Sequence, residues 1–195
     1  DALERFEESD SDTRQNRQDA HDDIVFSRLS DQWPAEIRAQ REAEGRPCLT
    51  VNRLPSFIRT VVNDARHNKP AIQVRPVDGG ADVETAKVIN GIVRSIERRS
   101  NAEVAYDTAI DGSVSGGFGF WQVSIDFVHD DSFDMEARIE RIANPLMVHW
   151  DAGTTCFDSS DWEYAFVSDF LSKDRFKALY PDADPVDFQG SDTFG

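Results

Sequence analysis

The sequence has few of the residues that would cross-link a fold or carry it through a membrane. Its two cysteines, Cys48 and Cys156, lie far apart and have no CxxC partner. A disulfide scaffold needs more cysteines and a cysteine zinc site needs them paired, so we expect two buried, reduced thiols. No apolar run approaches the length of a membrane span, and no signal-peptide pattern is present. We therefore expect a protein of a reducing compartment, with no membrane partner.

Positive charge is also scarce. The chain holds 21 Lys and Arg against 37 Asp and Glu, a formal net charge of -16. A domain that binds nucleic acid tightly is usually net basic, whereas this chain has a sequence pI near 4.5, so its long-range field repels DNA. Hydrophobic residues make up 39% of the chain, which predicts a modest core. The 13 Phe and four Trp exclude a disordered acidic chain, which would be poor in aromatics.

Motifs of covalent and phosphate chemistry are missing. There is no GxxxxGK[ST] loop, no GxSxG elbow, and no paired spacing among the four histidines. The glycine-rich run Ser115–Gly119 leads from a predicted helix into a predicted strand, whereas anion-binding loops open onto a helix N-terminus. We interpret it as a tight turn with a close backbone approach. The sequence predicts no catalytic residue, no metal, no cofactor and no enzyme activity.

One acidic cluster leaves an alternative open. It lacks the glycine and the terminal glutamate of an EF-hand loop, and we interpret it as a solvated hairpin turn. A metal-dependent nuclease built on this cluster (Asp126–Asp134) is the alternative hypothesis. Its members are Asp126, His129, Asp130, Asp131 and Asp134.

The segment Gly45–Val77 has the clearest local pattern. Cys48–Val51 is an apolar run that predicts a strand, and Pro55 suits the first position of a helix. Apolar residues at helical spacing continue that helix to about His67. Alternation over Ile72–Arg75 then predicts a second strand.

This segment is basic, in contrast to the rest of the chain. It has one acid and six cations, which are Arg46, Arg53, Arg59, Arg66, Lys69 and Arg75. Because Arg is enriched at protein interfaces and the whole chain would repel DNA, we favour a subunit interface. The basic candidates are Arg53, Arg59, Arg66 and Lys69. They would face carboxylates of an adjacent copy, for which the candidates are Asp130, Asp131 and Asp134.

The remaining elements predict an α+β fold, with N-terminal helices packed on an antiparallel sheet region and a short C-terminal helix. Residues 1–13 are expected to be a flexible acidic tip, and residues 182–195 a loose acidic tail. The expected helices begin at Arg14, Ala35, Asp82 (as N-cap), near Asn101, and at Ser172 (as N-cap). The expected strands are Trp121–Phe127, a return strand around Ala137–Glu140, Leu146–Trp150 and Trp162–Leu171.

Several blocks resemble one protein family. The run GRPCLTVNRLPSFIRTVVNDARHNKPAIQVRPVDGGAD resembles the N-terminal signature of tailed-phage portal proteins of the short-tailed branch. The upstream DQWP and the downstream SNAEVAYDTAIDGSVSGGFGFWQVSIDFVHDDSFDMEARIERIANPLMVHWD follow in the same order. The similarity extends from about Asp22 to about Pro181.

The resemblance implies a structural role. A portal is a ring of twelve identical subunits at one capsid vertex, and double-stranded DNA passes through it without tight binding. It contacts the major capsid or scaffolding protein, the terminase large subunit and the tail or adaptor proteins. It assembles in the host cytoplasm and ends in the virion. Residues 14–181 would form the wing region, with the other portal domains outside this chain. A monomeric adaptor protein is a further alternative.

Overall fold

The computed structural model describes residues 2–28, 32–68, 72–77, 82–129, 131–151, 153–156 and 158–183. Its helices are α1 (Ala2–Ser27), α2 (Ala35–Ala43), α3 (Leu54–His67), α4 (Val83–Arg99), α5 (Ala102–Gly116), the 3₁₀ helix η1 (Pro145–Met147) and α6 (Lys173–Leu179). Its strands form two antiparallel pairs, β1 (Trp121–Phe127) with β2 (Met135–Arg141) and β3 (Val148–Trp150) with β4 (Ala165–Val167). The α+β class and the short C-terminal helix are confirmed.

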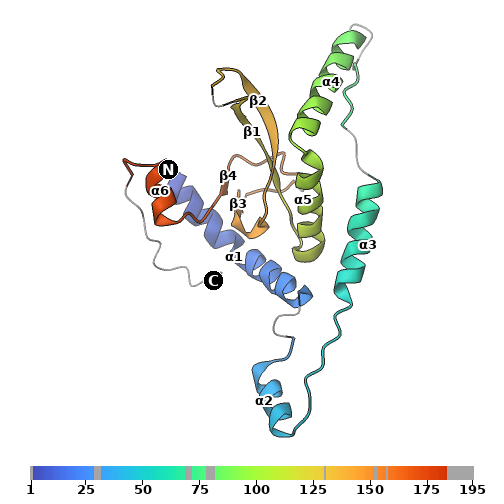
Figure 1. Ribbon diagram of the computed structural model, residues 1–195, viewed down its shortest axis with the longest axis vertical. Coiled ribbons are helices and arrows are strands. Elements are labelled where there is room, and N and C mark those ends of the chain that lie inside the picture. Colours follow the sequence, from blue (N-terminus) through green and yellow to red (C-terminus); the bar gives the residue numbers. More distant parts are fainter. Residues whose placement is uncertain are drawn as a thin grey trace.

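Helix α5 is the element around which the others gather (Figure 1). It contacts α1, α3, α4 and β2, while α1 also packs on β3 and α4 on β2. Helix α2 stands apart from this group (Figure 1). In the part of the chain described, no helix is both long and apolar enough to cross a membrane.

The fold leaves much of the chain in solvent. Its accessible surface is 15054 Å², whereas a compact monomer of 22.0 kDa would expose only about 9,300 Å². The side chains that are buried are mostly small, with Ala102 and Ala105 packed against Ile139 at the junction of α5 and β2. Alanines let helices and strands approach closely but remove little apolar area from water. The interior alone is therefore small for a chain of this length.

Local sequence signals place α3, α4 and α6 where they were predicted. Pro55 stands in the first turn of α3, and the Asp82 carboxylate accepts a hydrogen bond of 2.8 Å from the Glu84 N–H at the start of α4. Ser172 caps α6 by accepting from the Arg175 N–H. Each device satisfies or removes a backbone N–H that a helix start leaves without a partner.

Two predicted strands are wrong, and two others are shorter than predicted, since residues 145–147 form η1 ahead of β3 and only residues 165–167 of the predicted 162–171 form β4. Residues 48–51 and 72–75 are extended but pair with no strand among the described residues, and Leu49 and Val51 are exposed. The second segment is held by a side chain instead: the Asn90 Nδ2 group donates to the Val74 carbonyl at 2.8 Å, and the Val74 N–H donates to Asn90 Oδ1 at 2.9 Å. An amide side chain on α4 thus replaces the strand partner that alternation predicts.

The β1–β2 hairpin is confirmed, with Val123 opposite Ile139 and Ile125 opposite Ala137. The glycine-rich run before it is the predicted tight turn. Gly117 has a φ of 87°, and a Cβ at Gly119 would overlap the carbonyl oxygen of Ala109. Glycine is therefore required where the chain leaves α5 and turns back along it.

Helix α1 begins at Ala2 rather than at Arg14, so the prediction of a separate solvated tip over residues 1–13 is wrong for the described residues. Ser9 and Thr13 are buried, and the Ser9 hydroxyl donates to the Trp150 carbonyl at 2.6 Å. These buried polar side chains face β3 and hold α1 against it. The acidic composition of the helix alone predicts that it would be solvated. The tail predicted for residues 182–195 lies outside the described residues from residue 184 onward.

A buried cationic contact joins α1 to β3. The Arg17 guanidinium, 3% exposed, donates to the His149 ring and to the Asp10 carboxylate. The Asp10 Oδ1 atom is also 3.4 Å from His149 Nδ1, and Ser168 Oγ is 3.3 Å from Nε2. Because a guanidinium has no acceptor, the imidazole must accept from it and is neutral.

Aromatic side chains pack on His149 and on the neighbouring Trp150. Phe6 packs on the His149 ring at 4.6 Å between centroids, and Phe120 packs on Trp150 at 5.6 Å.

The predicted burial of both thiols is wrong: Cys156 is exposed and Cys48 is half-buried, although both are free.

We predict that the stability of this chain depends on pH through His149. Burial, and then the charge of Arg17, lower the pKa of His149 to about 4 from an ordinary value of 6.5. As the pH falls, His149 takes up a proton in the unfolded state before it does so in the folded state. The contribution of this residue to stability is therefore complete above pH 6.5 and is lost as the pH drops toward 4. Urea unfolding should show that the free energy of unfolding decreases by up to about 3 kcal/mol over this pH range. His149→Gln should lack that part of the slope, and equal slopes in both proteins would contradict the assignment.

We predict opposite effects for two glycine substitutions. Gly119→Ala should destabilise the chain by about 1–3 kcal/mol because backbone must move to admit the methyl group. Gly91→Ala on α4 is the matched control, since nothing lies within 4 Å of its added Cβ and a helix interior favours Ala by about 1 kcal/mol. Urea unfolding followed by circular dichroism measures both. Equal shifts of the two midpoints would contradict the close approach at Gly119.

Candidate functional site

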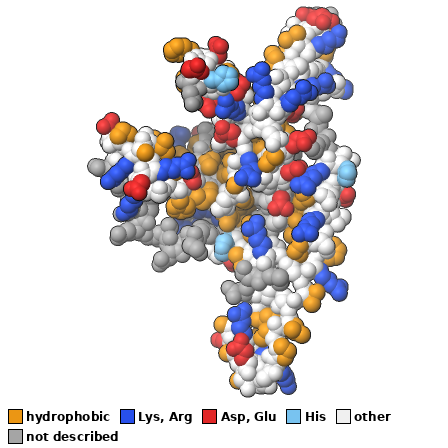
Figure 2. Space-filling view, viewed as in Figure 1, with side chains coloured by type: hydrophobic (Ala, Val, Ile, Leu, Met, Phe, Trp, Pro, Cys, Tyr) orange, Lys and Arg blue, Asp and Glu red, His pale blue; other side chains and the backbone are white. Residues whose placement is uncertain are grey.

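The basic residues predicted at an interface lie on and beside α3. Arg53 directly precedes the helix, and both Arg53 and Arg59 are exposed. Arg66 is used within the chain, because its Nε atom is 2.9 Å from Asp107 Oδ2 on α5. Lys69 lies outside the described residues. Figure 2 shows Lys and Arg side chains spread along the edge that α3 and α4 form.

The acidic residues predicted at the interface lie at the far end of the β1–β2 hairpin. Asp131 and Asp134 are exposed there, in a turn closed by a 2.9 Å hydrogen bond from the Val128 N–H to the Asp134 carbonyl. Asp130 lies outside the described residues. No ion pair between described residues links this acidic set to the basic set on α3, where Arg66 pairs with Asp107 instead.

The same hairpin has no arrangement that resembles a metal centre in the described residues. The Asp126 carboxylate accepts from the Phe127 N–H at 2.8 Å and lies 3.3 Å from Arg138 Nη1. Over the described ranges, no group of three or more His, Cys, Asp or Glu side chains could hold an ion. The nuclease hypothesis therefore gains no support from the geometry.

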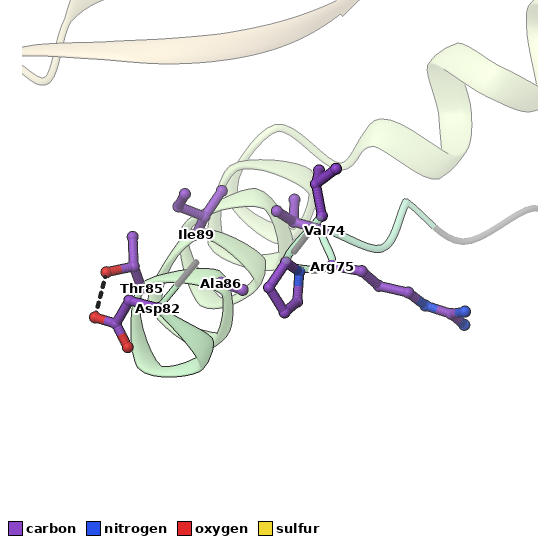
Figure 3. A pocket seen from close by; sticks show the side chains of 8 residues that line it. Val74, Arg75, Asp82, Thr85, Ala86 and Ile89 are labelled. Atoms are coloured by element: carbon purple, nitrogen blue, oxygen red, sulfur yellow. Dashed lines mark hydrogen bonds between the residues drawn. The ribbon is translucent and has the colours of Figure 1, made fainter. Parts of the chain in front are cut away.

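One hollow lies beneath the extended segment that Asn90 holds on α4 (Figure 3). It has a volume of about 330 Å³ and is lined mainly by apolar side chains, among them Val74, Ala86 and Ile89. Its carboxylate, Asp82, is occupied by the helix cap and by the Thr85 hydroxyl at 2.8 Å. With its one acid already engaged, the hollow offers no convergent polar groups for catalysis.

A second hollow separates α4 from β2. It has a volume of about 300 Å³, and the apolar members of its lining are Ile92, Ile96, Met135 and Ala137. At its edge the Glu136 carboxylate accepts from Arg138 Nε at 2.9 Å and from Arg99 Nη1 at 3.2 Å, and these hydrogen bonds lower the pKa of Glu136. The Arg99–Glu136 ion pair links α4 to β2 at the edge of the hollow, whereas Arg138 and Glu136 both lie on β2.

The apolar face of the hairpin extends beyond this hollow into solvent. Alternation predicts a strand with one face buried, but Val123, Ile125 and Phe127 on β1 are 62%, 69% and 50% exposed. Only Ile139 on that face is buried, against α5. The alternation identified the apolar face correctly but did not show that the described chain covers it only around Ile139, because periodicity indicates which side of a strand is apolar and not what packs on it.

Arg17 and His149 were also missed as partners. They are 132 residues apart and belong to no motif. The one signal in the sequence is that Arg17 lies on the same helical stripe as Ala20 and Ile24. A cation at that position is also compatible with a solvated helix face. Their role is structural, since both side chains are enclosed.

The comparisons with known proteins agree with the resemblance seen in the sequence. The family model described as "Phage P22-like portal protein" matches residues 3–194. A curated portal protein from Acyrthosiphon pisum secondary endosymbiont phage 1 is 28% identical over 187 residues, which is 91% of this chain and 26% of the relative. The chain thus spans about a quarter of the length of that relative. It belongs to the P22-like family of phage portal proteins.

Proposed function

We propose that this chain forms part of the subunit of a portal ring at one capsid vertex, through which double-stranded DNA is packaged and ejected. Twelve copies would form the ring, which assembles in the host cytoplasm and remains in the virion. The terminase large subunit, the tail or adaptor proteins and the capsid or scaffolding protein are the proposed partners. The observation that carries the proposal is the match to the portal family over residues 3–194.

The charge of the chain supports a conduit for DNA. Each phosphate that Lys or Arg neutralises adds affinity and would slow a moving duplex. A formal net charge of -16 works against such contacts over the chain as a whole. The role proposed is therefore passive: the residues shape a wall and contact neighbours.

The proposed contact between neighbours combines the basic and acidic sets. In a cyclic ring one patch meets a different patch on the next copy. Arg53 and Arg59 on one copy would face Asp131 and Asp134 on the next, with Lys69 and Asp130 as further members of the two sets. Arg66 is a weaker member than its sequence predicts, because it already pairs with Asp107.

The ring itself is tested by the mass of the full-length protein. We predict a closed oligomer of about twelve copies by native mass spectrometry, the number implied by the portal resemblance, with a ring visible in negative stain. A monomer at micromolar concentration would instead favour the adaptor hypothesis. Because the two outcomes differ in mass by an order of magnitude, one measurement separates them.

Charge reversal tests the electrostatic contact. We predict that Arg53→Glu with Arg59→Glu raises the concentration needed for half-assembly about tenfold at about 0.01 M salt, where screening is weak, and much less at about 1 M. Arg175→Glu with Lys177→Glu on α6 is the matched control, since it also reverses two exposed charges and lies on a different element. Equal assembly of the double variant and the control at low salt would contradict the contact.

A further inference from the structure

The hollow between α4 and β2 is the base of a longer apolar groove. Helix α4 and the hairpin diverge from α5 (Figure 1). Ile92 and Met135 line the base and are still 53% and 60% exposed. Phe127 stands opposite Met135 and Ile125 opposite Ala137, so the lining continues across the hairpin onto β1. We call this surface the α4–hairpin groove.

Helix α3 carries a matching apolar ridge. Val62 is buried where α3 contacts α5. Leu54, Phe57 and Val61 recur at i, i+3 and i+7 on a second stripe and are 39%, 66% and 51% exposed. We call these three residues the α3 ridge.

The charges around the two surfaces are opposite. Arg53 and Arg59 flank the α3 ridge, and the one acid of that helix is Asp64. The groove ends at the hairpin turn, where Asp131 and Asp134 are exposed. The basic flanks of the ridge and the acidic end of the groove are complementary in charge, and the one cation in the groove lining, Arg99, is already paired with Glu136.

A chain cannot place this ridge in its own groove. Helix α3 is held on α5 by the buried Val62 and by the ion pair between Arg66 and Asp107. The groove lies between α4 and the hairpin, and α3 is absent from its lining. Within the described residues, the ridge and the groove therefore do not contact each other.

We propose that the α3 ridge of one copy docks into the α4–hairpin groove of the next copy. The inference rests on the proposed ring and specifies the surface that builds it. The contact is heterologous, as a ring requires, because two different patches meet and each copy keeps one of each free for its neighbours. Phe57 supplies the aromatic anchor at the centre of the ridge, and the Arg and Asp side chains form the polar rim.

Cysteine cross-linking tests the docking directly. In the full-length protein with its native cysteines replaced by serine, Phe57→Cys is combined with Met135→Cys and the protein is oxidised gently. We predict a ladder of disulfide-linked multimers on a non-reducing gel, which neither single variant gives. Ile37→Cys with Met135→Cys is the control, because Ile37 is exposed on α2 away from the ridge. A ladder no stronger than that of the control overturns the docking.

Native mass spectrometry of the same samples separates this inference from the proposed function. Rings without the ladder overturn the docking and leave the portal assembly intact. Folded monomers, with a normal helical circular-dichroism spectrum, overturn both.

Truncation of the anchor gives a second readout. Phe57 is exposed, so Phe57→Ser should fold normally and raise the concentration for half-assembly about tenfold, the loss typical of an aromatic anchor. Phe170→Ser is the matched control, since Phe170 is 80% exposed and lies between β4 and α6. An equal effect of the two substitutions counts against the ridge.

Discussion

The small size of the hydrophobic core is the main physical constraint on this chain. Among the described residues the buried apolar side chains are few and mostly alanines, and the accessible surface, 15054 Å², is far above that of a compact monomer of this mass. What holds the elements together is partly polar: Arg17 joins α1 to β3, Asn90 holds residues 72–77 on α4, and Arg66 ties α3 to α5. Because such contacts fix geometry without covering apolar surface, the described residues keep apolar faces exposed to solvent.

The exposed apolar faces are compatible with the proposed ring. A subunit that assembles head to tail needs two unlike surfaces, each incomplete in the isolated chain. The α3 ridge and the α4–hairpin groove meet that requirement, and both lie within the region that the portal family model matches. In the proposed role the net acidity serves a different purpose, since it would limit binding to the DNA that the ring surrounds.

The sequence predicted the elements whose signals are local. Caps and helical spacing located α3 and α4, and alternation located the β1–β2 hairpin. It failed where the partner is distant in sequence. Residues 48–51 resemble a strand in composition but have no strand beside them, and burial of α1 depends on residues more than a hundred positions away. Of the predicted interface residues, Arg53, Arg59, Asp131 and Asp134 are exposed as an interface requires, while the apolar surfaces beside them were not foreseen.

The most direct test is a cryo-electron microscopy map of the assembled full-length protein at side-chain resolution. The account predicts that helix 54–67 of each subunit lies between α4 and the β1–β2 hairpin of its neighbour, with the Phe57 ring against Met135 and Ile92. A map in which that groove faces solvent, or holds another segment of the same subunit, would contradict it.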